Sequence, residues 1–208
     1  MGLRVLCVLA GGTPPFQSLA DLAQGADAVW AADSGQDVCL ANGFLPHVVV
    51  GDLDSVSERM PGVEYRERPD QDHSDCDKLL AEVRGLGEVD LVMAGLEGDR
   101  FDHVVTSLSS IARSGLSPRI LLQQGFGVFC RAGAGLAFRA SPGQVFSLLS
   151  LDGALVSTRG ARWEMQDRTV SFSSGFSLSN EFAGDRLEIR VDQGVVMAIL
   201  DSLPLAWH

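Results

Sequence analysis

Short apolar runs alternate with amphipathic stretches through the first part of the chain, up to Gln124. Several runs are apolar at successive positions, which is typical of parallel strands covered on both faces. We predict strands at Leu3–Leu9, Ala28–Ala32, His47–Val50, Val63–Arg66, Val89–Ala94 and Ile120–Gln124. We predict helices at Phe16–Gln24, Gly35–Asn42, Asp75–Arg84 and Asp102–Arg113. Strands that alternate with helices indicate a doubly wound, mostly parallel sheet with flanking helices.

The pattern changes after Gly125, where helical periodicity stops and short strand-like segments are separated by Gly, Ser and Asp. Leu187, Ile189 and Val191 show the period of two that is typical of a half-buried strand. The predicted strands are Gly127–Arg131, Leu136–Ala140, Val145–Leu151, Thr169–Phe172, Arg186–Val191 and Val195–Leu200. We therefore predict an α/β domain over residues 1–125 and a C-terminal β-sandwich over residues 126–208. We expect Trp207 and His208 only to end the last strand.

Composition narrows the choice of partners. The 208 residues are 46% hydrophobic, and 27 acidic against 16 basic residues give a formal net charge of -11. That charge is unfavourable for binding nucleic acid or an anionic membrane, so a phosphate ligand needs a metal ion or a few placed cations. The four cysteines lack metal-ligand spacing and predict buried free thiols in a reducing cytosol. The N-terminal apolar run is too short to span a membrane, so we expect a cytoplasmic protein.

Polar residues that directly follow the predicted strands are the candidates for chemistry, because ligands of open α/β sheets bind beyond the carboxyl ends of the strands. Gly11–Thr13 follows the first strand, and Ala32–Gly35 follows the second. Glycine in such a turn lets backbone N–H groups approach a phosphate, but chain reversal alone also requires it. Each turn by itself is a weak signal.

The segment GDLDS follows the strand at His47–Val50 and carries two carboxylates, Asp52 and Asp54. Alternation along an extended chain aims both to the same side, where they repel one another unless a cation lies between them. Magnesium prefers such oxygen ligands together with substrate phosphate. An ordinary Asp-rich turn with a helix cap at Asp54 or Ser55 is the alternative for this segment taken alone.

Two further segments add charge at the starts of helices. Residues 69–78 hold several acids ahead of Lys78, and residues 95–103 bring Arg100, Asp102 and His103 to the start of the next helix. Helix capping explains some of these acids but not their number. Arg100 has the geometry to hold a phosphate with two hydrogen bonds. Acid-containing segments at three successive strand ends therefore predict a site for a metal ion and phosphate.

This ordered set of motifs resembles the thiamine pyrophosphokinase family. The segments ADSGQ, GDLDS, PDQDHSDCDK and GLEGDRFDH are similar to that family's A-D-G-G, G-D-x-D-S, D-x-x-x-[ST]-D-x-x-K and G-x-R-x-D-[HQ]. In the β region, Gly160–Trp163 resembles the family's segment with an aromatic residue, and Ser177–Phe182 resembles its S-N-E-F segment. Ser34 departs from the pattern, since the family usually has a second glycine there.

The resemblance implies transfer of the diphosphoryl group of ATP to the hydroxyethyl oxygen of thiamine, with Mg²⁺ as cofactor. It also implies a catalytic nucleotide-binding domain, a thiamine-binding and dimerisation domain, and a homodimer whose active sites use both subunits. By position, Mg²⁺ would be held by Asp52, Asp54 and Asp75. The catalytic residues would be Asp75, Lys78, Arg100 and Asp102, with either Asp75 or Asp102 orienting or deprotonating the hydroxyl. Substrate contacts would come from Asp33, Ser34, Gly35, Gln71, Trp163, Ser179 and Asn180.

Two other classes of protein stay open on the residues alone. A metal-dependent hydrolase or nucleotide-sugar transferase also uses D-x-D after a strand, and would release phosphate without an acceptor or require a nucleotide sugar. A catalytically idle nucleotide or thiamine sensor is the third class. The intact set of charged residues argues against a pure sensor, because binding alone has less need of every charged member.

Overall fold

The computed structural model describes residues 2–15, 17–98, 100–175, 177–201, 203, 205 and 207. The chain divides into two compact units, one formed by Met1–Gln123 with Pro204–His208 and the other by Gln124–Leu203. All four cysteines are buried free thiols, as the sequence predicts. Among the helices of the described residues, none is both long and apolar enough to cross a membrane.

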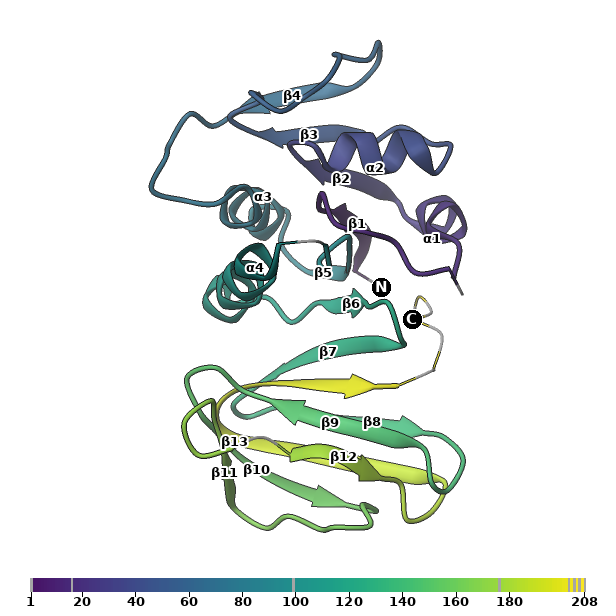
Figure 1. Ribbon diagram of the computed structural model, residues 1–208, viewed down its shortest axis with the longest axis vertical. Helices are drawn as coiled ribbons and strands as arrows, with labels where there is room; N and C mark the ends of the chain where they lie inside the picture. The colour runs from purple at the N-terminus through teal and green to yellow at the C-terminus, as the bar shows by residue number, and fades with distance from the viewer. Residues whose placement is uncertain are drawn as a thin grey trace. The chain divides into compact units, whose positions relative to one another are not determined.

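The first unit is built on a parallel sheet with the strand order β6-β5-β1-β2-β3-β4 (Figure 1). Its strands are β1 (Leu3–Val8), β2 (Ala28–Ala32), β3 (Val48–Gly51), β4 (Glu64–Glu67), β5 (Val89–Ala94) and β6 (Arg119–Leu121). In the centre, Leu6 of β1 is in register with Val29 of β2 and with Val92 of β5. The chain moves outward from β1 in one direction and returns on its other side at β5. The crevice at that switch point is the expected ligand site.

The helices cover both faces of this sheet. They are α1 (Leu19–Gly25), α2 (Gly35–Ala41), α3 (Asp75–Arg84) and α4 (Phe101–Ser114). Figure 1 shows α1 and α2 on one side of the sheet and α3 and α4 on the other, as right-handed crossovers require. Ser74 starts α3 with a capping box, in which its side chain and that of Asp77 bond each other's backbone N–H. Asp75 is thereby fixed as the first residue of that helix.

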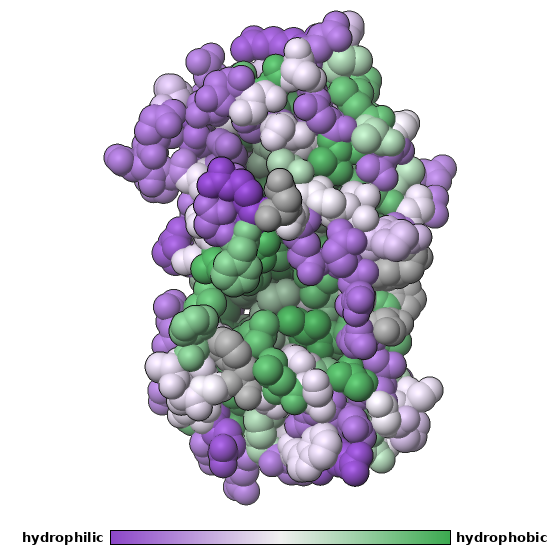
Figure 2. Space-filling model, in the orientation of Figure 1, coloured by the Kyte–Doolittle hydropathy of each residue, from purple (hydrophilic) through white to green (hydrophobic). Residues whose placement is uncertain are grey.

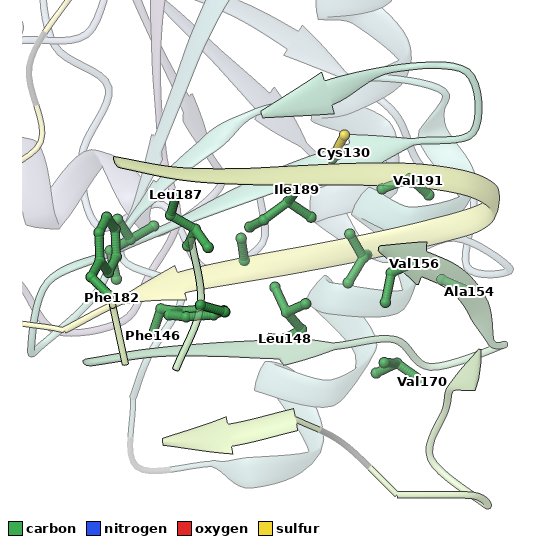
Figure 3. Close-up of a cluster of buried hydrophobic side chains, with 14 residues drawn as sticks. Cys130, Phe146, Leu148, Ala154, Val156, Val170, Phe182, Leu187, Ile189 and Val191 are labelled. Atoms are coloured by element: carbon green, nitrogen blue, oxygen red, sulfur yellow. The ribbon is translucent and has the colours of Figure 1, made fainter. Parts of the chain in front are cut away.

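The second unit is a β-sandwich. Its strands are β7 (Phe126–Arg131), β8 (Gly135–Arg139), β9 (Val145–Leu149), β10 (Ala154–Arg159), β11 (Arg168–Val170), β12 (Ser177–Glu181) and β13 (Arg186–Leu200). The first half of β13 pairs with β8 and β10, and its second half pairs with β7 and β9. Alternate residues of these strands fill the core, where Phe146 and Phe182 meet edge to face at 5.8 Å between ring centroids (Figure 3).

Two strand predictions in this unit were wrong. The segments Arg186–Val191 and Val195–Leu200 form one continuous strand, β13, because Gly194 continues it with a φ of 76° instead of ending it. The register between β10 and β13 shifts by one residue between Leu155 and Val156, with Asp192 as the extra residue of a β-bulge two positions before Gly194. The strands Ala154–Arg159 and Ser177–Glu181 were missed, although Ala154 and Val156 show the buried alternation. Gly194 obscured the continuous strand β13, and Ser157 and Thr158 obscured the alternation of β10.

The C-terminal residues correct another expectation. Trp207 does not end a strand: β13 stops at Leu200, and Trp207 packs beside Gly25 at the end of α1. Its indole N–H donates a hydrogen bond to the carbonyl oxygen of Leu22, at 3.1 Å. His208 lies outside the described residues.

A second contact fixes this segment to the first unit. The Gln17 side chain accepts from the N–H of Leu205 at 2.9 Å and donates to its carbonyl oxygen at 2.5 Å. The Arg119 guanidinium lies 5.7 Å from the centroid of the Trp207 ring, in a cation–π contact. Leu205 is buried. The segment is therefore part of the folded first unit.

We expect Trp207→Ala to lower the free energy of unfolding of the first unit by about 1–3 kcal/mol, because it removes a hydrogen bond, a cation–π contact and the ring packing on α1. Urea unfolding followed by the helical circular dichroism signal measures it, since the described helices all lie in this unit. Trp163→Ala is the matched control: that side chain is 54% exposed in the second unit and its loss should not move the helical midpoint. Equal midpoints for both variants would contradict a stabilising role of Trp207.

Candidate functional site

A cleft of about 660 Å³ lies in the first unit at the carboxyl ends of the strands. It opens where β1 and β5 adjoin, which is the switch point of the sheet. Residues from the turns after β1, β2, β3 and β5 and from the starts of α3 and α4 line it. The polar lining includes Asp33, Ser34, Ser55, Ser74, Asp75, Arg100, Asp102, His103, Thr106 and Ser107.

Three carboxylates meet at the edge of this cleft. Asp33, Asp52 and Asp75 each place an oxygen atom within 4.8 Å of the others. Asp33 is only 4% exposed, and its Oδ1 is buried without a hydrogen-bond partner among the residues that the structure describes. Burial, and then the negative charges of Asp75, Asp52 and Asp54, raise the pKa of Asp33 to about 6. The cluster is electrostatically incomplete in the protein alone.

The approach of these acids depends on the backbone at the ends of two neighbouring strands. Asp33 follows β2 with a φ of 43°, and its N–H donates to the carbonyl oxygen of Val50 on β3. A Cβ on Gly51 would lie 2.9 Å from the Cβ of Asp33 and 3.3 Å from Oδ1 of Asp75. Only glycine leaves that space open. Gly51 is thus a residue of the site that the sequence analysis did not select, although it lies inside the GDLDS motif.

Lys78 supplies the nearest positive charge. Its Nζ lies 3.1 Å from Oδ1 of Asp75 and 4.0 Å from Oδ2 of Asp52, and the residue is only 8% exposed. The spacing of three residues on α3 brings Lys78 and Asp75 to the same face of the helix. Gln71 donates from Nε2 to Oδ2 of Asp52 at 3.1 Å, and this bond is the main cause that lowers the pKa of Asp52. One lysine leaves an excess of negative charge among three acids.

Asp54 flanks the cluster. It is exposed and does not belong to the group of three that meets within 4.8 Å. Its N–H donates to Oδ1 of Asp52 at 3.4 Å, and its own Oδ1 accepts from the Ser55 hydroxyl at 2.8 Å. Leu53, between the two acids, has a φ of 63°, so the segment turns instead of continuing as a strand. The expected alternation of Asp52 and Asp54 along an extended chain is therefore interrupted.

Arg100 and Asp102 stand together at the start of α4. Two bonds join them, from Nε to Oδ1 at 3.2 Å and from a terminal nitrogen to Oδ2 at 2.6 Å. The hydrogen bond from Arg100 is the main cause that lowers the pKa of Asp102. Both side chains are exposed and line the cleft.

Backbone hydrogen bonds join the turn after β1 to the turn after β5. The N–H of Gly11 donates to the carbonyl oxygen of Gly95 at 2.8 Å, and that of Gly12 to Glu97 at 2.6 Å. Ser34 lines the cleft, whereas Gly35 is buried at the start of α2, where it packs on the backbone of β1. Only part of this glycine-rich region therefore faces the ligand space.

The remaining predicted residues lie in the second unit. Trp163 is 54% exposed, with the Arg162 guanidinium 4.8 Å from its ring centroid. Buried Asn180 accepts from the N–H of Trp163 at 3.1 Å and donates to its carbonyl oxygen at 2.8 Å. Its Oδ1 also accepts from the N–H of Glu181 at 2.8 Å. Ser179 is exposed with a φ of 53°. Asn180 thus fixes the backbone that presents the indole.

The acid cluster fits a hard divalent cation. Carboxylate oxygens are the ligands that Mg²⁺ prefers, and the unpartnered Oδ1 of Asp33 lacks the positive charge that such an ion brings. A parallel sheet with this cluster at the carboxyl ends of its strands, beside Lys78 and with Arg100 in the same cleft lining, is typical of an enzyme that acts on phosphate groups.

The sequence comparisons identify the family. The chain matches the family model "Thiamin pyrophosphokinase, catalytic domain" over residues 19–122 and "Thiamin pyrophosphokinase, vitamin B1 binding domain" over residues 136–196. The protein belongs to the thiamin pyrophosphokinase family. Thiamin pyrophosphokinase 1 of Caenorhabditis elegans is 25% identical over 171 residues, which are 74% of this chain and 70% of the relative.

Solved structures confirm the fold. Thiamin pyrophosphokinase from Candida albicans superposes with a TM-score of 0.78 at 15% identity, covering 96% of this chain and 89% of the other. The Bacillus subtilis enzyme gives a TM-score of 0.76 at 18% identity, covering 97% and 100%. Yeast thiamin pyrophosphokinase gives 0.78 at 17% identity, covering 96% and 86%. The predicted combination of an α/β domain with a β-sandwich is therefore confirmed.

We expect Gly51→Ala to weaken binding of the Mg²⁺–ATP complex at least about tenfold, because the added methyl group separates Asp33 from Asp75. Isothermal titration calorimetry measures the affinity. Gly184→Ala is the matched control, since a Cβ there meets no atom within 4 Å. Affinity that is unchanged in Gly51→Ala would show that the close approach of the acids is not needed.

Proposed function

We propose that the protein transfers the diphosphoryl group of ATP to the hydroxyethyl oxygen of thiamine, giving thiamine diphosphate and AMP. The observation that carries this proposal is the cluster of Asp33, Asp52 and Asp75, with its unpartnered buried oxygen, in a chain that matches both domains of the family. Another metal-dependent phosphate enzyme on the same fold is not favoured, because the second match covers the vitamin B1 binding domain.

In this proposal, Asp52 and Asp75 hold Mg²⁺ with Asp33, and Asp54 completes the set from the exposed side of the same turn. The bound ion supplies charge neutralisation for the phosphate oxygens. Lys78 is held beside Asp75 and Asp52, so its ammonium group is placed to stabilise charge on the transferred group. Transfer of this kind depends mainly on positioning and charge, because its transition state is loose.

Arg100 and Asp102 act from the start of α4, in the lining of the cleft. Arg100 binds phosphate oxygens with its planar guanidinium group, exchanging one anionic partner for another. Asp102, whose pKa Arg100 lowers, is a weak base and orients the attacking hydroxyl. Asp75 is the alternative for that role. The hydroxyl oxygen attacks the β-phosphorus in line, and the bond from that phosphorus to the oxygen that bridges to the α-phosphate breaks. AMP leaves with the bridging oxygen, and the carboxylate that orients the hydroxyl accepts its proton.

Thiamine is a cationic heteroaromatic ligand, which suits an aromatic face and an acidic surrounding. We assign the aromatic face to Trp163, whose exposed ring is held by Asn180 through its backbone. Ser179 and Gln71 supply polar contacts to the ligand, and Ser34 lies on the nucleotide side. We further propose a homodimer in which each active site uses both subunits. Exposed Phe101 and Val105 on α4, where Figure 2 shows apolar surface, support such an association.

The direct test mixes the protein with ATP, Mg²⁺ and thiamine and measures AMP and thiamine diphosphate by chromatography. We expect the two products in equal amounts, and none when thiamine or Mg²⁺ is left out. AMP formation that does not depend on thiamine, at micromolar enzyme, would contradict the proposed function.

We expect Asp54→Ala to lower kcat/KM by about 100-fold or more, because it removes a proposed ligand of the metal ion. The circular dichroism spectrum should stay unchanged, because the side chain is exposed. Asp72→Ala is the control: it is an exposed acid of the neighbouring segment, outside the cleft and the cluster. Turnover that survives in Asp54→Ala would remove that residue from the metal site.

Active sites shared between subunits predict complementation. Asp54→Ala damages the first unit and Trp163→Ala the second, so a mixed dimer contains one site with neither change. After dissociation and reassociation of an equal mixture, about a quarter of all sites are intact, and activity should recover to about that level. Sites contained within one chain would instead give the mean of the two variants.

A further inference from the structure

The turn between β3 and β4, residues 52–63, carries Asp52 and Asp54 but has little backbone structure of its own. Within the described residues, its backbone–backbone hydrogen bonding consists of the N–H of Val63 donating to the carbonyl oxygen of Met60. A segment that bears like charges and lacks backbone bonds needs other contacts to hold its shape.

Side chains from outside the turn provide those contacts. Gln36, at the start of α2, is 0% exposed, and its Nε2 donates to the carbonyl oxygen of Glu58 at 2.7 Å. Its Oε1 accepts from the hydroxyl of Tyr65 on β4. The same hydroxyl accepts from the N–H of Met60 at 2.7 Å. Gln36 and Tyr65 therefore hold the turn at two backbone positions, through one continuous chain of hydrogen bonds.

The Tyr65 hydroxyl has a defined donor and acceptor role in these hydrogen bonds. The Tyr65 hydroxyl donates its only hydrogen to Gln36 and accepts from Met60, so the direction of the chain is set. The Arg59 guanidinium lies 5.2 Å from the Tyr65 ring centroid. A separate bond runs from the Ser57 hydroxyl to Oδ1 of Asp37 on α2, at 2.7 Å.

The hydrogen bonds of Gln36 also connect two segments that supply carboxylates to the metal site. The backbone N–H of Gln36 donates to the carbonyl oxygen of Asp33 at 3.1 Å, while the Gln36 side chain holds the turn that carries Asp52 and Asp54. Repulsion among these carboxylates pushes the turn away from Asp33. Gln36 opposes that displacement from a fully buried position.

We propose that Gln36 and Tyr65 are positioning residues of the metal site: they hold the β3–β4 turn at the separation from Asp33 that a shared divalent cation requires. The inference rests on the proposed function only where turnover is the readout. A role in folding alone predicts lower stability with unchanged metal affinity. A positioning role predicts weaker metal binding in a protein that is still folded.

Gln36→Met and Tyr65→Phe test this with little change in side-chain volume. Each should weaken Mn²⁺ binding, measured by electron paramagnetic resonance, about tenfold. The double variant should be hardly weaker than either single variant, because both break the same chain. Amide hydrogen exchange should accelerate at Met60 in Tyr65→Phe, because its N–H loses the hydroxyl that accepts from it, and stay unchanged in α1. Gln193→Met, at an exposed position of β13, is the matched control and should bind Mn²⁺ like the unaltered protein.

Turnover adds a separate readout. The variants should need about tenfold more Mg²⁺ for half-maximal rate, with kcat at saturating Mg²⁺ within about twofold of the unaltered protein. Unchanged Mn²⁺ affinity in both single variants would overturn the positioning role, whatever their thermal stability. If Mn²⁺ binding weakens as expected but the unaltered protein forms no thiamine diphosphate, the proposed function fails and the positioning role stands.

Discussion

Repulsion among the carboxylates of Asp33, Asp52 and Asp75 is the constraint on which the catalytic unit depends. Two like charges about 4 Å apart cost about 1 kcal/mol in bulk water and about 4 kcal/mol at the effective dielectric of a protein surface. Folding imposes this cost, because parallel strands deliver their carboxyl ends to one edge of the sheet. Lys78 offsets part of it. The remainder favours a cation, so the unfavourable energy of the unliganded site becomes affinity for metal and phosphate.

Uncharged parts of the site fix the positions of these carboxylates against their repulsion. Gly51 carries no side chain at the point where the acids converge, and the left-handed backbone of Asp33 turns its carboxylate into the cluster. Gln36 and Tyr65 hold the β3–β4 turn through hydrogen bonds to its backbone at Glu58 and Met60. None of these features is acidic, yet each sets the distance between the acids. The geometry of the site therefore depends on residues that a search for charged motifs passes over.

The sequence predicts the first unit well, because continuous apolar runs and capped helices mark the bounds of its elements to within three residues. Asp52 and Asp75 follow from their motifs. Asp33 was expected to contact substrate, and the sequence could not place it among the acids, since that depends on a φ of 43° and on adjacent strands. The second unit was less predictable, because the glycine and bulge in β13 resemble a turn. Trp207 could not be predicted at all, since its contacts lie far away in the sequence.

Ser34 shows how structure resolves a departure from a family pattern. A serine in place of the second glycine raises the question of whether the turn can still form, but Ser34 has a φ of −64° and a ψ of −3°, which any residue adopts. The following Gly35 is the constrained position: a Cβ there would lie 2.2 Å from the carbonyl oxygen of Val8. Helix α2 can approach β1 only because that glycine is kept. The turn therefore tolerates Ser34 without strain, and its hydroxyl is left to face the cleft.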